Sequence, residues 1–231
     1  MKVAVVFPFR AGCPHREAAY RAASTWWATA VPEWEQITAD DEGDVFSRGG
    51  SLNVGISESD ADVIVAADAD LLISRTQILE AVELAGSALG LVQPFTRLHW
   101  YAEAATAVLL EHPHAAFYPP TPPATYRWDV DESTPLLGGM NVLSRESWER
   151  AGGWPTSFRG WGHEDLVFAA QCRTLVAPHR KVAGTVHHLY HPKPVTTDYA
   201  SPETITRNTA EAERWLAADG DPAAMRELVR G

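Results

Sequence analysis

Two acidic side chains with a spacing that suits metal chemistry stand at the end of an apolar run. The run Ala61–Ala67 is apolar except for Asp62, and Asp68 and Asp70 follow it with one alanine between them. Carboxylate oxygens suit Mg²⁺ or Mn²⁺, and these ions usually complete their coordination with phosphate oxygens. The spacing predicts a site for a divalent cation and a nucleotide diphosphate, although an acidic turn that caps the next helix would have the same sequence.

Three histidines lie close together nearer the C-terminus, at His187, His188 and His191. Imidazole is a good ligand for Mn²⁺ and related metals. His188 and His191 are three residues apart at the end of an expected strand, so they can face one ion. His187 points the other way along the strand, so we expect it to be an ordinary histidine and not a ligand. Taken alone, such a cluster is more often an ordinary surface group than a metal site.

A glycine-rich stretch from Gly152 to Asp165 is the third candidate. Glycine lets the backbone approach a ligand closely, and Trp161 offers a flat apolar face to a sugar ring. Glu164 and Asp165 open the following helix, whose dipole favours their ionised forms. An ionised, partly enclosed Asp165 suits a general base. The structural alternative is a glycine-rich turn with a buried tryptophan and an N-capping acid.

These candidates need elements that position them, and the apolar pattern predicts such elements in the first part of the chain. We expect strands at Lys2–Phe9, Glu35–Thr38, Ala61–Ala67 and Gly90–Pro94, and helices at His15–Ala30, Ser47–Ser59 and Thr76–Ala88. Continuously apolar strands that alternate with helices are typical of an α/β fold with a parallel sheet and helices on both faces. Ligands bind beyond the carboxyl ends of such strands, where Asp68 and Asp70 fall.

The second part of the chain has a different character. The proline-rich segment Phe117–Tyr126 predicts a surface loop or lid. We expect strands at Leu136–Ser144 and Lys181–Tyr190, and helices at Tyr101–Leu110, Arg145–Ala151, Glu164–Thr174 and from Ser201 to about Ala218. Two groups of aromatic residues receive different predictions: packing for Trp26, Trp27 and Trp34, and either packing or sugar stacking for Trp100, Tyr101, Tyr126 and Trp128.

Composition narrows the class of protein. The 231 residues are 45% hydrophobic and 21% charged, as in one soluble globular domain. The net charge of −11 disfavours a nucleic-acid partner, although a modified base as acceptor stays open. Cys13 and Cys172 match neither a zinc pattern nor a disulfide framework, and no apolar run reaches the roughly 20 residues of a membrane span. We therefore expect a cytoplasmic protein.

Five blocks of sequence, in order, resemble the inverting β-1,4-galactosyltransferase group and related enzymes with a galactosyltransferase-type C-terminal region. The blocks are Pro8–Arg10; Phe46–Gly55; Asp68–Asp70; Gly138–Ser144 with Gly153–Pro155 and Gly160–Asp165; and His188–His191. The resemblance implies a GT-A fold, with a Rossmann-like, mostly parallel central sheet. It also implies transfer of a sugar from a UDP-sugar to a hydroxyl group, with Mn²⁺ or Mg²⁺ as cofactor.

The resemblance also implies a role for each matching residue. Asp165 corresponds to the catalytic base, and Asp70, His188 and His191 correspond to metal ligands. The residues implied in binding the nucleotide sugar or the acceptor are Pro8, Phe9, Arg10, Asp41, Arg48, Asp68, Ala69, Gly139, Trp161 and Glu164. Of these, Arg10 and Arg48 would offset the charge of the diphosphate.

Three positions depart from the family pattern. His163 replaces a glycine and Leu166 interrupts a run of acids, so the acceptor wall differs. Leu136 stands where an aromatic residue often narrows the donor pocket, which leaves room for an N-acetyl group. The usual acceptor is therefore not assumed, and the donor sugar is a hexose or an N-acetylhexosamine.

The sequence thus predicts one GT-A domain over residues 1–231, with a nucleotide-sugar half at 1–95 and an acceptor and catalytic half at 96–231. We expect a metal-dependent inverting glycosyltransferase that uses a UDP-sugar and a carbohydrate or other hydroxyl acceptor, from a bacterium or phage. Two alternatives stay open. One is a retaining enzyme like the polypeptide N-acetylgalactosaminyltransferases, and the other is a catalytically idle module that binds carbohydrate or nucleotide.

Overall fold

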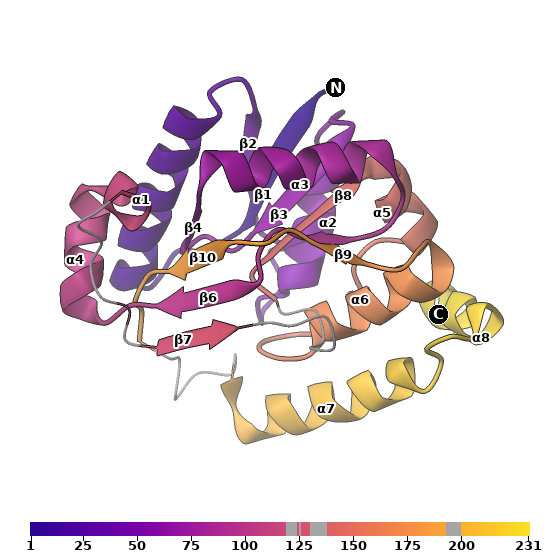
Figure 1. Ribbon diagram of the computed structural model, residues 1–231. Coiled ribbons are helices and arrows are strands. Elements are labelled where there is room, and N and C mark those ends of the chain that lie inside the picture. Colours follow the sequence, from indigo (N-terminus) through magenta and orange to yellow (C-terminus); the bar gives the residue numbers. More distant parts are fainter. Residues whose placement is uncertain (119–123, 125, 130–137, 193–199) are drawn as a thin grey trace.

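The computed structural model describes residues 1–118, 124, 126–129, 138–192 and 200–231. The predictions about Leu136, the middle of the proline-rich segment and the Trp128 side chain lie outside the described part of the chain. Within it, α/β alternation runs through the first ninety residues as expected (Figure 1).

A six-stranded sheet with the order β2-β1-β3-β8-β5-β9 forms the centre of the molecule. Its strands are β1 (Val3–Pro8), β2 (Glu35–Ala39), β3 (Val63–Ala67), β5 (Val92–Gln93), β8 (Met140–Ser144) and β9 (Arg180–Lys181). Strand β1 is parallel to β2 and β3, and β5 is parallel to β9. Strand β8 runs antiparallel to β3 and β5. The mostly parallel sheet is therefore confirmed, with β8 as its reversed strand.

Strand β1 shows why this sheet is covered on both faces. Val3, Val5 and Phe7 belong to one core cluster, whereas Ala4 and Val6 belong to another. Side chains alternate between the faces of a strand, so apolar residues at every position require cover on each side.

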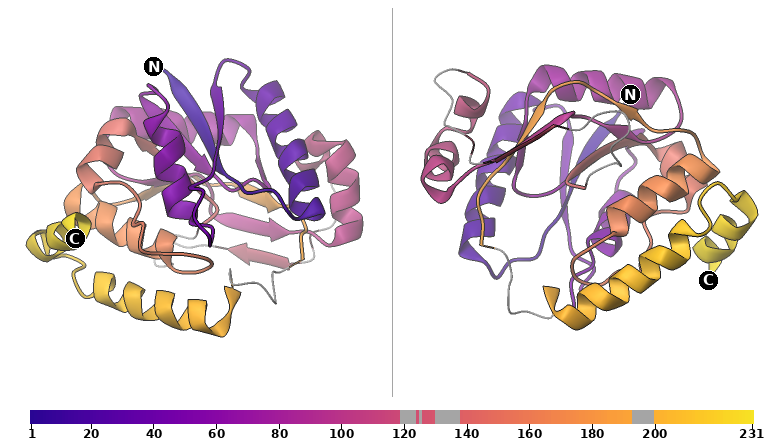
Figure 2. Two further views of the ribbon diagram at one scale, coloured as in Figure 1. Left: turned by 180° about the vertical axis from the view of Figure 1, so that it is seen from behind. Right: turned by 60° about the horizontal axis from the view of Figure 1, so that its bottom comes forward.

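Helices supply that cover, and two views of the ribbon show them on opposite sides of the sheet (Figure 2). On one side lie α1 (Pro14–Ala30) and α3 (Arg75–Ser87), and on the other lie α2 (Arg48–Ser57), α5 (Arg145–Ala151) and α6 (Glu164–Leu175). Trp27 in α1 is 1% exposed, and the Trp26 Nε1–H donates to the Ile73 carbonyl at 2.9 Å. The packing role expected for these tryptophans is confirmed.

A second, four-stranded sheet was not expected from the sequence. It has the order β4-β10-β6-β7. Its strands are β4 (Leu71–Ile73), β6 (Arg97–Trp100), β7 (Tyr126–Asp129) and β10 (Thr185–His188). The expected single strand Lys181–Tyr190 is instead split between the two sheets. Gly184, with φ of +148°, lies at the break, where few other residues fit.

The remaining helices are α4 (Glu103–Glu111), the short 3₁₀ helix η1 (Pro113–Ala116), α7 (Pro202–Leu216) and α8 (Pro222–Arg230). The Ser201 side chain accepts from the Thr204 amide, which confirms the predicted N-cap of α7. Helix α8 was not predicted. Phe158, Val167, Trp215 and Met225 form a separate cluster that fastens α7 and α8 to α6. None of the described helices combines the length and apolar character that a membrane crossing needs.

Candidate active site

Strands β4 and β10 bring Asp70, His188 and His191 together. The strands are antiparallel, and the Leu189 amide donates to the Asp70 carbonyl at 2.9 Å. One ligand atom of each of the three side chains lies within 4.8 Å of the others. His191 Nε2 is 3.2 Å from Asp70 Oδ2, and His188 Nε2 is 3.9 Å from Asp70 Oδ1. Residues far apart in the sequence therefore converge, as a shared metal site requires. We call these three residues the metal triad.

The metal triad fits a divalent transition metal. One carboxylate and two imidazoles are a donor set that suits Mn²⁺ and related ions. The Asp70 side chain is buried, and its Oδ1 atom has no hydrogen-bond partner among the described residues. A buried polar atom without a partner is costly and calls for an explanation. A cation bound by the triad would give Asp70 Oδ1 that partner.

The two imidazoles also set the charge of Asp70. Burial alone would raise the pKa of Asp70, but His188 and His191 outweigh burial and hold that pKa well below its usual range. In return, the hydrogen bond to Asp70 raises the pKa of His191. Asp70 is therefore ionised at neutral pH, which is the state that binds a cation.

Arg48, the first residue of α2, joins the other aspartate of the motif to the predicted base. Its Nε lies 2.5 Å from Asp68 Oδ1, and its Nη1 lies 2.5 Å from Asp165 Oδ1. Burial lowers the pKa of Arg48, but Asp165 and Asp68 outweigh it and raise that pKa far above the usual range. We call Arg48, Asp68 and Asp165 the arginine cluster. The family resemblance implied that Arg48 offsets the charge of a diphosphate; in the structure its guanidinium binds two carboxylates of the protein.

Glu164 lies at the edge of the arginine cluster and has an unusual pKa. Burial and the neighbouring Asp165 charge raise the pKa of Glu164 to about 7, against the opposing effect of Arg48. Burial likewise raises the pKa of Asp68, with Arg48 acting in the opposite direction. Carboxyl groups with raised pKa values close to one another are a common feature of catalytic sites.

Two glycines before β8, Gly138 and Gly139, lie against Asp165 and Asp68 of the arginine cluster. A Cβ atom at Gly138 would collide with Asp165 Oδ2. Gly139, with φ of +99°, accepts a hydrogen bond at its carbonyl from the Asp68 amide at 2.7 Å. These two positions therefore need glycine, one for space beside Asp165 and one for backbone conformation. Ala69, between the two aspartates, is buried.

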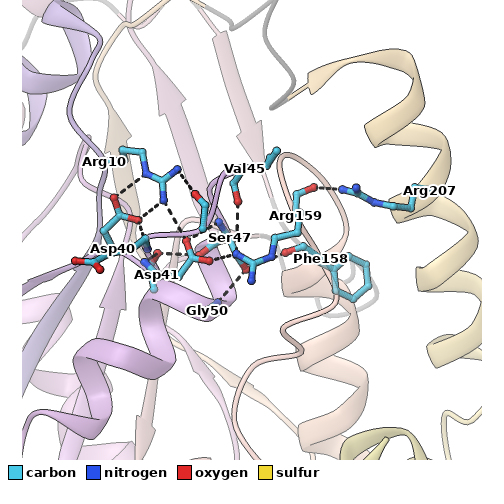
Figure 3. Close-up of polar contacts among 12 residues, drawn as sticks. Arg10, Asp40, Asp41, Val45, Ser47, Gly50, Phe158, Arg159 and Arg207 are labelled. Atoms are coloured by element: carbon cyan, nitrogen blue, oxygen red, sulfur yellow. Dashed lines mark hydrogen bonds and ion pairs between the residues drawn. The ribbon is translucent and has the colours of Figure 1, made fainter.

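The residues expected on the nucleotide lie at the ends of β1 and β2. Arg10 Nε donates to Asp40 Oδ2 at 2.7 Å, and its Nη1 donates to the Gly43 carbonyl at 2.8 Å. The buried Asp41 carboxylate binds Arg159 and accepts from the Ser47 amide (Figure 3). Arg10 and Asp41 thus already have protein partners.

The aromatic residues near the histidines have different environments. The His187 Nδ1 atom and the Tyr101 hydroxyl are 2.7 Å apart, and both residues are buried. Burial, with a smaller effect of His99, lowers the pKa of His187 to about 4, so the ring is neutral and packs in the interior. Trp100 instead lies 5.7 Å from the His188 ring, with Tyr126 5.4 Å from Trp100. Trp100 therefore borders the metal triad, and Tyr126 packs against Trp100.

Three polar residues in or near the site were not predicted. Arg16, in the first turn of α1, acts electrostatically on both Asp70 and His191. Its position after a buried strand was a usable sequence signal, because helix N-termini after such strands commonly receive phosphates. Arg159 and Asn208 had no comparable signal, since their partners lie far away in the sequence.

Comparison with known proteins agrees with this geometry. Residues 124–193 match the family model described as "N-terminal domain of galactosyltransferase". The matched segment includes β8, the glycine-rich stretch, Asp165 and both triad histidines. No match was found among curated proteins.

Solved structures share the fold over most of this chain. Drosophila β-1,4-galactosyltransferase 7 in complex with manganese, UDP-Gal and xylobiose has a TM-score of 0.57 and 20% identity, over 89% of this chain and 79% of that one. Mycobacterium tuberculosis glucosyl-3-phosphoglycerate synthase with Mn²⁺, UDP and phosphoglyceric acid has a TM-score of 0.52 and 16% identity, over 95% and 78%. S. aureus TarS has a TM-score of 0.57 and 10% identity, over 99% and 69%.

These findings define the class of protein. The fold is that of the GT-A glycosyltransferases, and the chain carries a galactosyltransferase-type segment in its second half. The fold class and the resemblance predicted from the sequence are both confirmed.

Proposed function

We propose that this protein is a metal-dependent, inverting glycosyltransferase that moves a hexose or N-acetylhexosamine from a UDP-sugar to an acceptor hydroxyl. The observation that carries the proposal is the convergence of the metal triad with the arginine cluster, through the two aspartates of one motif. A metal site next to an enclosed carboxylate is the arrangement that sugar transfer from a diphosphate needs.

Residues 1–95 would bind the donor and residues 96–231 the acceptor. Asp70, His188 and His191 would hold the metal, which, when bound, offsets charge on the diphosphate. Arg16, whose charge acts on the metal triad, would approach the diphosphate from the N-terminus of α1. Pro8, Phe9, Arg10 and Asp41 would border the uridine at the ends of β1 and β2, and Gly139 and Ala69 would contact the donor sugar.

Asp165 would act as the general base in a single displacement. Its Oδ1 atom is held by Arg48, which leaves Oδ2, on the Gly138 side, to receive a proton. The acceptor hydroxyl gives its proton to Oδ2, and the acceptor oxygen forms the new bond to the anomeric carbon. The bond from that carbon to the diphosphate oxygen breaks, and the electron pair leaves with UDP. Attack from the opposite face inverts the anomeric configuration.

The acceptor side would be formed by exposed aromatic residues. Trp161 is 57% exposed and Tyr126 is 56% exposed, whereas large aromatic side chains are normally well buried. Such faces stack on sugar rings, so a carbohydrate acceptor is the favoured class. Two unpaired cysteines agree with a cytoplasmic location.

A UDP-release assay tests the proposal. The protein would be incubated with Mn²⁺ and UDP-glucose, UDP-galactose, UDP-N-acetylglucosamine or UDP-N-acetylgalactosamine, with xylose, xylobiose, glucose, galactose or N-acetylglucosamine as acceptor. We expect release that EDTA abolishes, and proton NMR of the product should show the inverted anomer. A retained anomer would support the retaining alternative, and UDP binding without turnover of any pair would support an idle binding module.

A further inference from the structure

The segment Phe158–Trp161 carries an exposed tryptophan, and most of its residues make hydrogen bonds or ion pairs to the rest of the protein. On one side the Ser47 hydroxyl donates to the Phe158 carbonyl at 2.8 Å, and the Gly160 amide donates to the Phe46 carbonyl at 2.8 Å. The Arg159 guanidinium binds Asp41. Figure 3 shows Arg159 reaching from this segment toward the end of β2.

Helix α7 forms hydrogen bonds to the same segment from the other side. The Asn208 side chain is fully buried, and its Nδ2 donates to the carbonyls of Arg159, at 3.1 Å, and Trp161, at 3.0 Å. Arg207 adds a bond from Nη2 to the Arg159 carbonyl at 2.6 Å. The His163 ring and the Thr209 hydroxyl are 3.2 Å apart. Three successive residues of α7 therefore contact the segment that leads into Asp165.

The Asn208 side-chain amide supplies hydrogen-bond donors to the irregular backbone around Gly160 and Gly162. Gly160 has φ of +74° and Gly162 has φ of +117°, so the backbone here is irregular and its carbonyls lack the partners that a helix or strand supplies. Buried carbonyls need donors from elsewhere. A carboxamide can donate two N–H groups at once, and Asn208 uses them on the carbonyls that flank Gly160.

We propose that Asn208 is a positioning residue for the acceptor site: it fixes the backbone that presents Trp161 and that leads into Glu164 and Asp165. The inference rests on the proposed function, because it assigns the acceptor to the Trp161 face. It makes α7, which contributes no side chain to the metal triad or to the arginine cluster, part of the acceptor-binding apparatus.

Gln171 in α6 provides a matched control. It is 1% exposed, and its Nε2 donates to the carbonyls of Ala151, at 2.7 Å, and Gly153, at 2.8 Å. Like Asn208, it therefore donates hydrogen bonds to two backbone carbonyls, but at the other end of the glycine-rich stretch. Loss of the Gln171 amide removes the donor of two carbonyls, whereas loss of the Asn208 amide removes that of Trp161 alone, because Arg207 still donates to the Arg159 carbonyl. Gln171→Ala should therefore lose at least as much stability as Asn208→Ala.

The experiment compares Asn208→Ala and Gln171→Ala with the wild type. The readouts are the melting temperature, calorimetric affinity for UDP with Mn²⁺, hydrogen exchange of residues 158–163, and steady-state kinetics. The kinetics use the pair of UDP-sugar and acceptor that gives most UDP release in the panel above. We expect both variants to have a lower melting temperature than the wild type and the same affinity for UDP. Asn208→Ala alone should exchange faster over 158–163 and should lose about 10- to 100-fold in kcat/KM for the acceptor, mainly through KM.

Asn208→Ser, which keeps one donor at this position, should lie between Asn208→Ala and the wild type, and it serves if the alanine variant does not fold. Equal acceptor kinetics for Asn208→Ala and Gln171→Ala, or unchanged exchange at 158–163 in Asn208→Ala, would overturn the inference. Failure of the proposed function has a different signature, which is no UDP release by the wild type with any pair.

Discussion

Asp68 and Asp70 belong to one three-residue motif, yet their carboxylates have different partners. Asp70 is buried between two imidazoles, and one of its oxygens has no hydrogen-bond partner within the described part of the chain. Asp68 is about one-third exposed and is bound by Arg48, which also binds Asp165. The metal triad thus has a ligand atom left for a cation. In the arginine cluster, Arg48 offsets one of the two carboxylate charges, and its buried Nη2 atom has no hydrogen-bond partner among the described residues.

We expect this difference to separate metal binding from chemistry within one motif. A site with unsatisfied ligand atoms gains from an added ion, so the metal triad should control nucleotide binding. A buried cation shared by two carboxylates mainly fixes geometry, and its loss leaves charges without partners. The arginine cluster should therefore control stability and turnover. The four predictions below test that division.

The largest effect is expected for Asp165→Asn. An amide cannot accept the hydroxyl proton, so kcat should fall by about 10²- to 10⁴-fold, the usual range for a general base. Affinity for UDP with Mn²⁺, measured by calorimetry, should change little because the metal triad is intact. A variant with normal kcat would show that another group takes the proton.

Arg48→Ala should have the next largest effect, on stability. It would leave Asp68 and Asp165 without their cation, and removal of one partner from a buried pair costs about 3–5 kcal/mol. Chemical denaturation measures the change.

The control for that variant is Arg97→Ala, which breaks an exposed pair with Asp129. Exposed pairs contribute about 0–1 kcal/mol, so this variant should stay near the wild type. Equal losses for the two variants would contradict the structural role of the arginine cluster.

Asp70→Ala should weaken UDP binding in the presence of Mn²⁺ by about 100-fold. The reason is that the metal loses its only carboxylate ligand in the triad, and even supporting residues of metal sites are worth about 10- to 100-fold. Asp60→Ala, which removes an exposed carboxylate paired with Lys2, is the control and should bind normally. Similar UDP affinity in both variants would remove Asp70 from the metal site.

The smallest effect is a pH-dependent gain in stability for Glu164→Gln. The folded-state pKa of Glu164 is raised to about 7, above its unfolded value near 4.5, so the wild type loses stability as pH rises between these values. Glutamine removes that loss. The variant should match the wild type at pH 4 and exceed it by at least about 1 kcal/mol at pH 8, in denaturation curves at both values. A gain at pH 4 alone would reverse the sign and contradict the account.

The sequence predicted the parts of the molecule that depend on local pattern. Apolar β1 and β3, the position of Asp68 directly after β3, and the N-cap of α7 all follow from residues within a few positions of one another. The convergence of Asp70 with His188 and His191 came from the family resemblance, and β4 and β10 now give it a structural cause.

Long-range polar partners could not be predicted in this way. Arg48 reads in the sequence as a cation for phosphate, and only the fold shows that Asp68 and Asp165 already surround it. Asn208 reads as an ordinary polar residue of an amphipathic helix, yet it is buried against the glycine-rich segment. The split of Lys181–Tyr190 into two strands also depends on long-range contacts, because the chain passes from one sheet to the other at Gly184.

The most direct test of the central claim is pulsed electron paramagnetic resonance of Mn²⁺ bound to the protein with UDP. Two imidazoles in the coordination shell should give nitrogen modulation that weakens in His188→Ala and in His191→Ala. A spectrum from bound Mn²⁺ and UDP without coupling to histidine nitrogen would contradict the account, because the metal would then lie away from the triad.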